Sequence, residues 1–226
     1  MTDSRAIELV MALRKQGIAD TRVLSAIETI PRDVFVEQPF ETQAYANSAL
    51  PIACGQTISQ PYVVAFATEV LEIDPKHRVL ELGTGSGYQA AVLSRLCRMV
   101  YTVERHKPLL TQAEERFRKL RLANIVTRHG DGLKGWPEAA PFDRILLSAA
   151  VPEVPQILID QLKPAGILVA PVGGDAQSAR GVSQSLTKIV KGEHGMEREN
   201  LLPVMYVPMI EGLPQNARAT DEPGKT

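Results

Sequence analysis

Cysteine is scarce in this chain, and it lacks both long hydrophobic runs and an excess of one charge. Its two cysteines, Cys54 and Cys97, are too few for a disulfide framework and have no metal-ligand spacing. Lysine and arginine number 25 against 26 acidic residues, so a net charge of −1 gives no strong field to recruit nucleic acid or an anionic membrane. No stretch approaches the ~20 apolar residues of a membrane span, and residues 1–30 contain no apolar run of signal-peptide length. We therefore expect a soluble cytoplasmic protein with no metal, nucleic-acid or membrane partner.

The apolar content of 44% is enough to bury a sizeable core, and 226 residues suit one structural domain overall. In the N-terminal part, residues 1–77, apolar side chains recur at helical spacing over 4–16 and 20–29, and helix returns at 62–72. The intervening segment 31–61 holds four prolines and is expected to be a long, largely irregular stretch that crosses the surface of the later domain. A loop of this length in a compact protein is usually functional.

The pattern changes at residue 78, where strand-like and helix-like segments begin to alternate. This alternation predicts βαβ units and an α/β fold, a Rossmann-like, doubly wound and mostly parallel sheet over 78–210. C-terminal edge strands are expected at 185–190 and 204–210, and a disordered tail at 211–226. The expected parallel strands are 78–82, 99–103, 125–127, 142–148 and 167–170, and the helices between them end at about 96 or cover 107–121 and 152–162.

A glycine loop, Gly83–Gly87, comes directly after the first of these strands and directly before a helix. Glycines at this point let the backbone approach a ligand closely, although a tight strand–helix turn would also use them. Glu104 ends the next strand, about 20 residues after the loop, where a carboxylate can accept hydrogen bonds from ribose hydroxyls. Asp131 and Gly132 follow the third strand. These loops meet at the carboxyl edge of the sheet, so we expect a nucleoside-containing cofactor.

The spacing of the glycines indicates which cofactor this is. The loop reads Gly-x-Gly-x-Gly, whereas the dinucleotide fingerprint would need a glycine at Tyr88. Glu81, two residues upstream, completes a pattern typical of S-adenosylmethionine methyltransferases, in which an acid near the methionine ammonium group is electrostatically reasonable. The alternative for Glu81 is a strand-end carboxylate paired with a basic neighbour.

The segment before the domain is the most specific motif. Residues 50–61, Leu-Pro-Ile-Ala-Cys-Gly-Gln-Thr-Ile-Ser-Gln-Pro, closely resemble the signature of the protein-L-isoaspartate O-methyltransferases. The resemblance covers about residues 4–210. It departs from the family pattern at Ala53 and at Ala46-Asn47, which flank the signature and bear on loop rigidity or substrate preference. The 174–184 region is also longer than in many relatives. Further matches in order are 30–32, 35–36, 44–45, 79–89, 103–105, 130–132, 141–143, 148–150, 162–166 and 206–208.

The resemblance implies methyl transfer from S-adenosyl-L-methionine to the free carboxylate of L-isoaspartyl residues in damaged proteins and peptides. S-Adenosyl-L-homocysteine is the other product, and the methyl ester collapses to a succinimide, which begins repair. The resemblance also implies a set of cofactor-binding residues: Thr57, Ile58, Ser59, Glu81, Gly83, Thr84, Gly85, Ser86, Gly87, Glu104, Arg105, Asp131 and Gly132.

Ser59 is the residue that we expect to act in catalysis. The accepting carboxylate has a pKa near ~4 and is already ionised, so no strong base is needed. Ser59 would orient it with one hydrogen bond; the alternative is a helix cap or turn residue. A peptide substrate is expected to contact small or backbone-presenting positions, for which plain packing is the alternative: Ser148, Ala149, Ala150, Tyr206 and Val207. We expect a monomer, and we expect His106 on an exposed turn without a catalytic role.

Three other functions stay open. A methyltransferase for nucleic acid or small molecules is one, although 148–152 lacks the Asn/Asp-Pro-Pro-aromatic motif and neither cysteine follows a proline. A nucleotide-binding protein without catalysis is another. A dehydrogenase is the third, and the glycine spacing argues against it.

Overall fold

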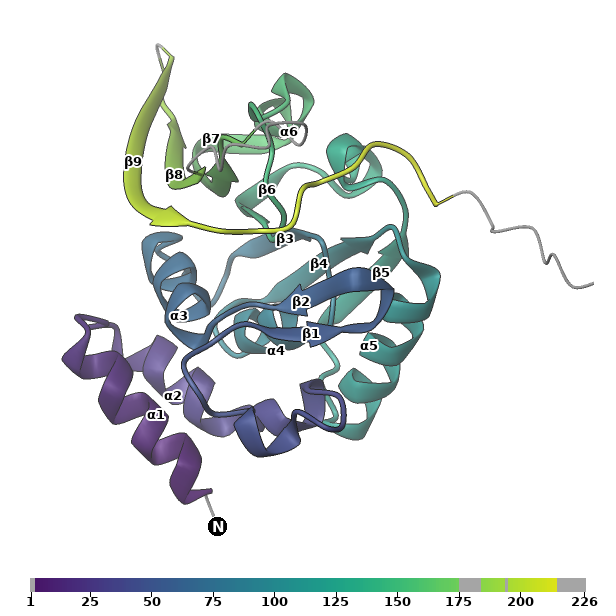
Figure 1. The fold of residues 1–226 in the computed structure, drawn as a ribbon. Coiled ribbons are helices and arrows are strands. Elements are labelled where there is room, and N and C mark those ends of the chain that lie inside the picture. The colour runs from purple at the N-terminus through teal and green to yellow at the C-terminus, as the bar shows by residue number, and fades with distance from the viewer. Residues whose placement is uncertain (1–2, 175–183, 194, 215–226) are drawn as a thin grey trace, which may run out of the picture.

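The computed structural model describes residues 3–174, 184–193 and 195–214. Its centre is a seven-stranded sheet with strand order β5-β4-β3-β6-β7-β8-β9 (Figure 1). The strands from β5 to β7 are parallel, and β8 and β9 are antiparallel additions at one edge. This confirms the predicted doubly wound α/β fold. The strand bounds are β3 Arg78–Leu82, β4 Met99–Glu104, β5 Ile125–His129, β6 Phe142–Leu147, β7 Leu162–Val172, β8 Gln184–Lys191 and β9 Met196–Val204.

Two hydrophobic cores lie on opposite faces of this sheet, because successive strand side chains alternate between faces. One core contains Val79 and receives side chains from all five N-terminal and central helices; the other contains Leu80 and Leu82 and receives α6. The helix bounds are α1 Ser4–Lys15, α2 Thr21–Thr29, α3 Pro61–Val70, α4 Tyr88–Ser94, α5 Lys107–Lys119 and α6 Gln156–Asp160.

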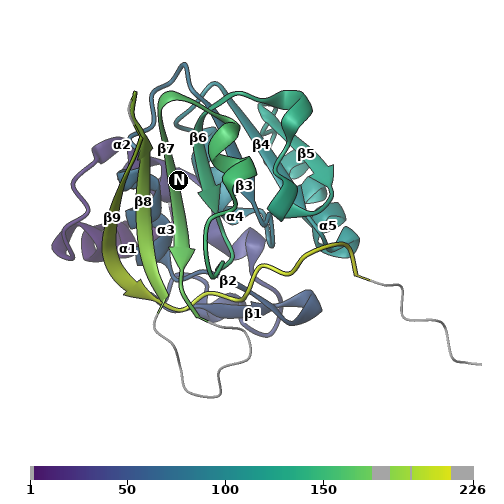
Figure 2. The same ribbon diagram turned by 90° about the horizontal axis from the view of Figure 1, so that it is seen from above.

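The proline-rich segment 31–61 is more regular than the sequence predicts. It contains short 3-10 helices at Arg32–Phe35 and Glu41–Gln43 and an antiparallel hairpin of β1 (Leu50–Ile52) and β2 (Gln56–Ile58). The hairpin lies beside the carboxyl ends of the main strands (Figure 2). Its turn places Cys54 at φ 57° and Gly55 at φ 65°, so the positive backbone angles fall after position 53 and an alanine fits there.

Two predicted elements are wrong in extent or place. The helix expected over 152–162 is confined to Gln156–Asp160, because Pro155 disfavours helical geometry in the residue before it. The strand expected over 204–210 lies instead at Met196–Val204, where exposed charged residues form an edge that discourages pairing with other chains.

Two further expectations fall largely outside the described residues. The expected disordered tail, 211–226, is described only to residue 214, and the longer 174–184 region is described only at its two ends. Within the ranges that are described, no helix combines the length and apolar character needed to cross a membrane.

The glycine at the start of α4 makes a testable packing prediction. Gly87 has φ +90°, and a Cβ there would lie 2.8 Å from Phe117 Cε1. Gly17 has φ +102°, but a Cβ at that position would meet no atom of the described residues within 4 Å. Gly17→Ala should lower the free energy of unfolding by about 1–2 kcal/mol through backbone strain alone. Gly87→Ala should lower the free energy of unfolding by about 1–3 kcal/mol more than Gly17→Ala does, because its methyl group also overpacks the contact between α4 and α5.

Urea-induced unfolding of both variants beside the wild type measures this difference. Equal losses at the two positions would show that the contact with Phe117 does not limit the size of residue 87.

Candidate active site

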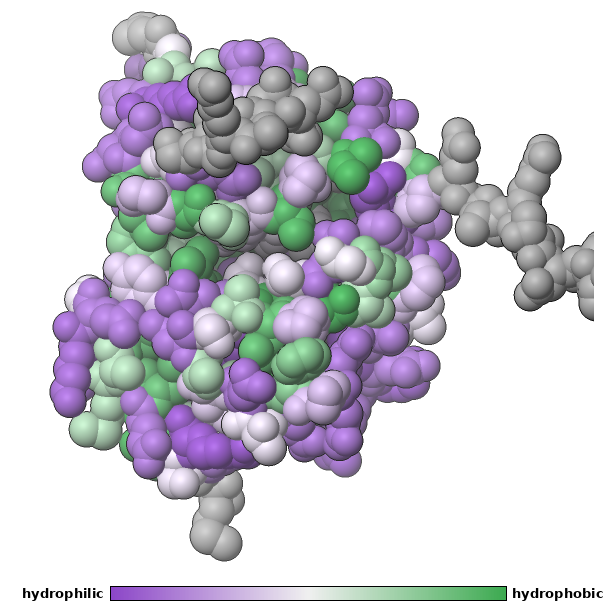
Figure 3. All heavy atoms as spheres, viewed as in Figure 1, coloured by the Kyte–Doolittle hydropathy of each residue, from purple (hydrophilic) through white to green (hydrophobic). Residues whose placement is uncertain are grey.

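A pocket opens at the carboxyl ends of β3, β4 and β6, between the β1–β2 hairpin and residues 205–212, which we call the C-terminal segment. The space inside it, counted out through the open mouth, is about 890 Å³. The surface is hollowed between these two walls (Figure 3). Most of the predicted site residues line it, namely Thr57, Ile58, Ser59, Glu81, Gly83, Thr84, Gly85, Ser86, Glu104, Arg105, Gly132, Ser148, Ala149, Tyr206 and Val207.

The glycine loop bends sharply between β3 and α4. Gly83, Gly85 and Gly87 all have positive φ, of 98°, 52° and 90°. The amide of Gly83 donates to the carbonyl of Val103 at 2.9 Å, which fixes the loop to the end of β4. Positive φ at three alternating positions is available to glycine at little cost, so this sequence folds the loop around the pocket without side chains in the way.

Glu104 connects two backbone segments at the floor of the pocket. Its side chain is 4% exposed, and its two carboxylate oxygens accept backbone amides from Gly85 and His106, each at 2.8 Å. It therefore joins the glycine loop to the first turn of α5. A carboxylate has about four acceptor positions, so both oxygens can still accept hydrogen bonds from a ligand.

Glu81 is fully buried, and its side chain contacts hydroxyl groups. Thr102 Oγ1 donates to its Oε2 at 2.7 Å, and Ser148 Oγ donates to its Oε1 at 3.4 Å. Among the described residues no lysine, arginine or histidine forms an ion pair with it, so the alternative of a basic neighbour is wrong. Burial raises the pKa of Glu81 to about 8, with the hydroxyls of Thr102 and Ser148 opposing this shift and Glu104 adding to it.

Ser59 occupies the joint between β2 and α3. The residue before the helix is Gln60, and the amide of Tyr62 in the first turn is capped by Asn47 Oδ1 at 2.9 Å. Asn47, one of the departures from the family pattern, thus performs the capping role that is the alternative for Ser59. Burial raises the pKa of Tyr206, and the adjacent Ser59 hydroxyl partly offsets this shift.

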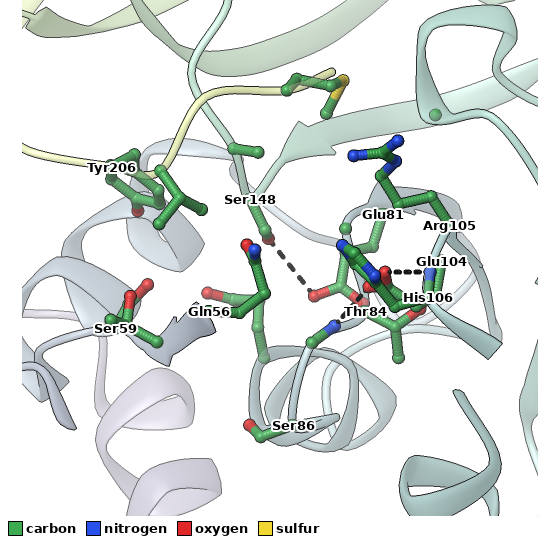
Figure 4. A pocket seen from close by; sticks show the side chains of 18 of the residues that line it. Gln56, Ser59, Glu81, Thr84, Ser86, Glu104, Arg105, His106, Ser148 and Tyr206 are labelled. Carbon is green, nitrogen blue, oxygen red and sulfur yellow. Dashed lines mark hydrogen bonds between the residues drawn. The ribbon is translucent and has the colours of Figure 1, made fainter. Parts of the chain in front are cut away.

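The polar side chains divide the pocket into two ends. Ser59 and Tyr206 lie on one side of Figure 4, and Glu104, Arg105 and His106 lie on the other. Glu81 and Ser148 stand between them and are joined by a hydrogen bond. An elongated ligand can therefore meet a carboxylate floor at one end and a hydroxyl at the other.

Three predicted site residues do not line the pocket. Gly87 faces Phe117, and Asp131 binds protein backbone, accepting the amides of Leu133 and Gly212 at 2.9 Å each. Arg105 Nε donates to the carbonyl of the same Gly212 at 3.1 Å. Asp131 and Arg105 together hold the C-terminal segment over the carboxyl ends of β4 and β5.

Ala150 is the third such residue. Its amide donates to Val207 at 2.8 Å, and its carbonyl accepts the amide of Met209 at 2.7 Å. The backbone groups of Ala150, which the sequence analysis expects to contact a substrate peptide, are bonded instead to the chain's own C-terminal segment.

Sequence reasoning missed several residues of the pocket wall. His106 is half-buried and lines the pocket, so the expectation of an exposed turn is wrong. Gln56 and Gln89 stand inside the motifs that carry the resemblance, so a signal for them existed. The sequence carries no such signal for Met209 and Ile210, because their position at the pocket depends on the path of the C-terminal segment. The remaining missed residues are Val64, Val103 and Pro208.

Comparison with known sequences identifies relatives across the whole length of the chain. The family model described as protein-L-isoaspartate(D-aspartate) O-methyltransferase matches residues 4–213. A protein-L-isoaspartate O-methyltransferase of Paramagnetospirillum magneticum is 56% identical over 213 residues, which is 94% of this chain and 98% of that protein. One from Rhodospirillum rubrum is 51% identical over 222 residues, covering 98% of each.

Comparison with solved structures finds similar folds in proteins that carry the same enzyme name. A structure named protein-L-isoaspartate O-methyltransferase has a TM-score of 0.79 at 28% identity, covering 90% of this chain and 65% of that longer one. A Plasmodium falciparum protein described under the same enzyme name, in complex with S-adenosyl-L-homocysteine, has a TM-score of 0.77 at 24% identity and covers 90% and 97%. From the match over residues 4–213 and the identity to full-length relatives, this chain belongs to the protein-L-isoaspartate(D-aspartate) O-methyltransferase family.

Proposed function

We propose that this chain transfers the methyl group of S-adenosyl-L-methionine to the free carboxylate of L-isoaspartyl residues in damaged proteins and peptides. The products are S-adenosyl-L-homocysteine and a methyl ester, which closes to a succinimide and so begins repair. One observation carries the proposal: a single pocket joins the buried carboxylates around the glycine loop to Ser59 of the family signature (Figure 4).

The residues of the pocket suit this cofactor. Glu104 has acceptor capacity for the ribose hydroxyls, and the glycine loop leaves room for the methionine part. Glu81 is buried and has no ion pair within the described part of the chain, so it is a complementary partner for the ammonium group. When bound, the cofactor supplies an electrophilic methyl group on a positively charged sulfur.

Ser59 acts on the other reactant. The substrate carboxylate is ionised at neutral pH, so it needs orientation rather than deprotonation. The Ser59 hydroxyl would donate one hydrogen bond to it and leave its second oxygen free to accept the methyl group. Holding reactants in such geometry can contribute roughly 7–11 kcal/mol to catalysis.

The peptide around the isoaspartate lies along the wall formed by Ser148, Ala149, Tyr206 and Val207. Small side chains at Ser148 and Ala149 leave space for a chain of varied sequence. Ala150 acts indirectly, because its backbone holds the C-terminal segment against this wall.

We also propose that residues 1–77 pack as an extension of the core at 78–210 in one structural domain, since Leu13 of α1 and Val79 of β3 share one hydrophobic core. The enzyme works as a cytoplasmic monomer on protein substrates, without nucleic acid, membrane or metal.

Transfer of labelled methyl groups from S-adenosylmethionine to two matched peptides tests the function. One peptide carries L-isoaspartate and the other a normal aspartate. Base-labile label on the isoaspartyl peptide alone is the expected result. If neither peptide is labelled while S-adenosylhomocysteine still binds, the acceptor is a different one.

Ser59→Ala should lower kcat for the isoaspartyl peptide by about ten-fold or more, because it removes the hydrogen bond that orients the carboxylate. Affinity for S-adenosylhomocysteine, measured by calorimetry, should stay within a few-fold. Ser48→Ala, an exposed serine in the same segment, serves as the control and should change neither value. Unchanged turnover in Ser59→Ala would show that Ser59 does not orient the substrate carboxylate.

Glu104→Gln should weaken binding of S-adenosylhomocysteine by about ten-fold or more, since hydrogen bonds to a charged acceptor are worth about 1.5–3 kcal/mol. The new amide also points donor against donor at Gly85 or His106. Glu8→Gln, on the exposed side of α1, is the matched control. Wild-type affinity in Glu104→Gln would exclude the ribose contact.

Glu81 gives the binding reaction a pH dependence. Its pKa of about 8 leaves it mostly protonated at pH 7, and an ammonium group beside it favours the ionised form. Cofactor binding at pH 7 should therefore release up to about one proton, measured by calorimetry in buffers of different ionisation enthalpy, and affinity should rise with pH up to about 8. Glu81→Gln should abolish the proton release.

Glu81 also makes the stability of the ligand-free protein depend on pH, and this dependence runs in the opposite direction to that of cofactor affinity. Because the pKa of Glu81 is higher in the folded state than its ordinary 4.5, the folded state holds more protons between these values. Stability should therefore fall as pH rises from about 5 through about 8, and Glu81→Gln should flatten this decline. A decline of equal slope in Glu81→Gln would assign it to other groups.

A further inference from the structure

Arg32 is a buried cation that no part of the proposed reaction uses. It begins the 3-10 helix Arg32–Phe35, and its side chain is 0% exposed. Among the described residues, no carboxylate lies within ion-pairing distance of it. Its Nη1 makes no hydrogen bond there either. Burying an arginine without a counter-ion is costly, so the contacts that the guanidinium does make need a reason.

Two of those contacts are to residues of the pocket wall, Ser59 and Tyr88, and the third is to Ala44. Nη2 donates to the carbonyl of Ser59 at 2.8 Å, and Nε donates to the carbonyl of Ala44 at 2.8 Å. The guanidinium carbon lies 4.7 Å from the ring centroid of Tyr88, the pocket residue that begins α4. One planar group thus joins the segment before the hairpin, the residue after the hairpin and the helix that follows the glycine loop.

The two carbonyls flank the β1–β2 hairpin. Ala44 precedes β1 and Ser59 follows β2, so Arg32 closes the ends of the segment 44–59 on itself. A hydrogen bond to the Ser59 carbonyl fixes the plane of that peptide group, and so restrains the ψ angle of Ser59 and the direction of the Cα–Cβ bond that carries its hydroxyl. The fixed fork of an arginine can satisfy both carbonyls while it stacks on the ring, whereas a lysine offers one compact ammonium.

We propose that Arg32 is a positioning residue that aims the Ser59 hydroxyl at the substrate carboxylate by holding the Ser59 carbonyl and the base of the hairpin. It does not touch the reactants. The inference rests on the proposed function for its effect on turnover, but the anchoring of the hairpin is independent of any activity.

A double-mutant cycle tests the link to Ser59. Arg32→Met should lower kcat for the isoaspartyl peptide by about ten-fold, but by less than about two-fold when it is added to Ser59→Ala, because the hydroxyl that it positions is then absent. Arg32→Lys should recover only part of the loss. Arg144→Met is the control: Arg144 is half-buried and also bonds carbonyls, those of Leu71 and Glu72, away from the pocket.

Hydrogen–deuterium exchange of the ligand-free variants provides the second readout. Amides of residues 44–62 should exchange about ten-fold faster in Arg32→Met than in the wild type, with no such change in Arg144→Met. If Arg32→Met does not fold, Arg32→Lys takes its place in both measurements with smaller effects of the same pattern.

The outcomes separate the two proposals. Unchanged exchange over 44–62 overturns the anchoring by Arg32, and equal losses of kcat with and without Ser59 overturn its action through that residue. A wild-type enzyme that does not methylate the isoaspartyl peptide overturns the proposed function, while the exchange measurement still decides whether Arg32 anchors the hairpin.

Discussion

The geometry of the pocket depends on the carboxyl end of β3, where the central strand stops between two parallel neighbours. The amide of Gly83 donates to Val103 at the end of β4, and the amide of Ser148 at the end of β6 donates to the carbonyl of Leu82. Three strand ends are thereby fixed in one place. Glu81, Glu104 and Ser148 are directed into the pocket from these ends, so the register of the sheet determines the spacing of the polar groups (Figure 4).

Short-range patterns are sufficient for the parts of the site that a single strand and its following loop create. Alternation and spacing place the strand Arg78–Leu82, the glycine loop and Glu104, because each depends on local backbone geometry. The path of the C-terminal segment is not predictable in this way. Met209 reaches the pocket because Ala150, Asp131 and Arg105 hold its segment, and none of these contacts is local in sequence. The expected strand at 204–210 fails for the same reason.

The binding site contains groups that the fold alone would not favour. Glu81 is buried beside hydroxyls instead of a cation, and Arg32 is buried beside carbonyls instead of a carboxylate. Each could pair with an opposite charge and gain stability. Within the described ranges neither does. Glu81 is buried but borders the pocket, and the guanidinium of Arg32 donates to the carbonyl of Ser59, the serine of the signature. Local conflicts with the rules for burying charge therefore indicate function here, as is common in binding sites.

The hydrogen bonds at Gly212 have a consequence for how the protein is made. Asp131 and Arg105 emerge from the ribosome long before Gly212, and they hold its amide and carbonyl in the finished fold. At about 5–20 residues added per second, roughly 2–7 seconds pass between the synthesis of Val172 at the end of β7 and the start of the C-terminal segment. During synthesis the pocket at the carboxyl ends of the strands therefore lacks one of its two walls. The second wall forms only after residues 205–212 have been translated.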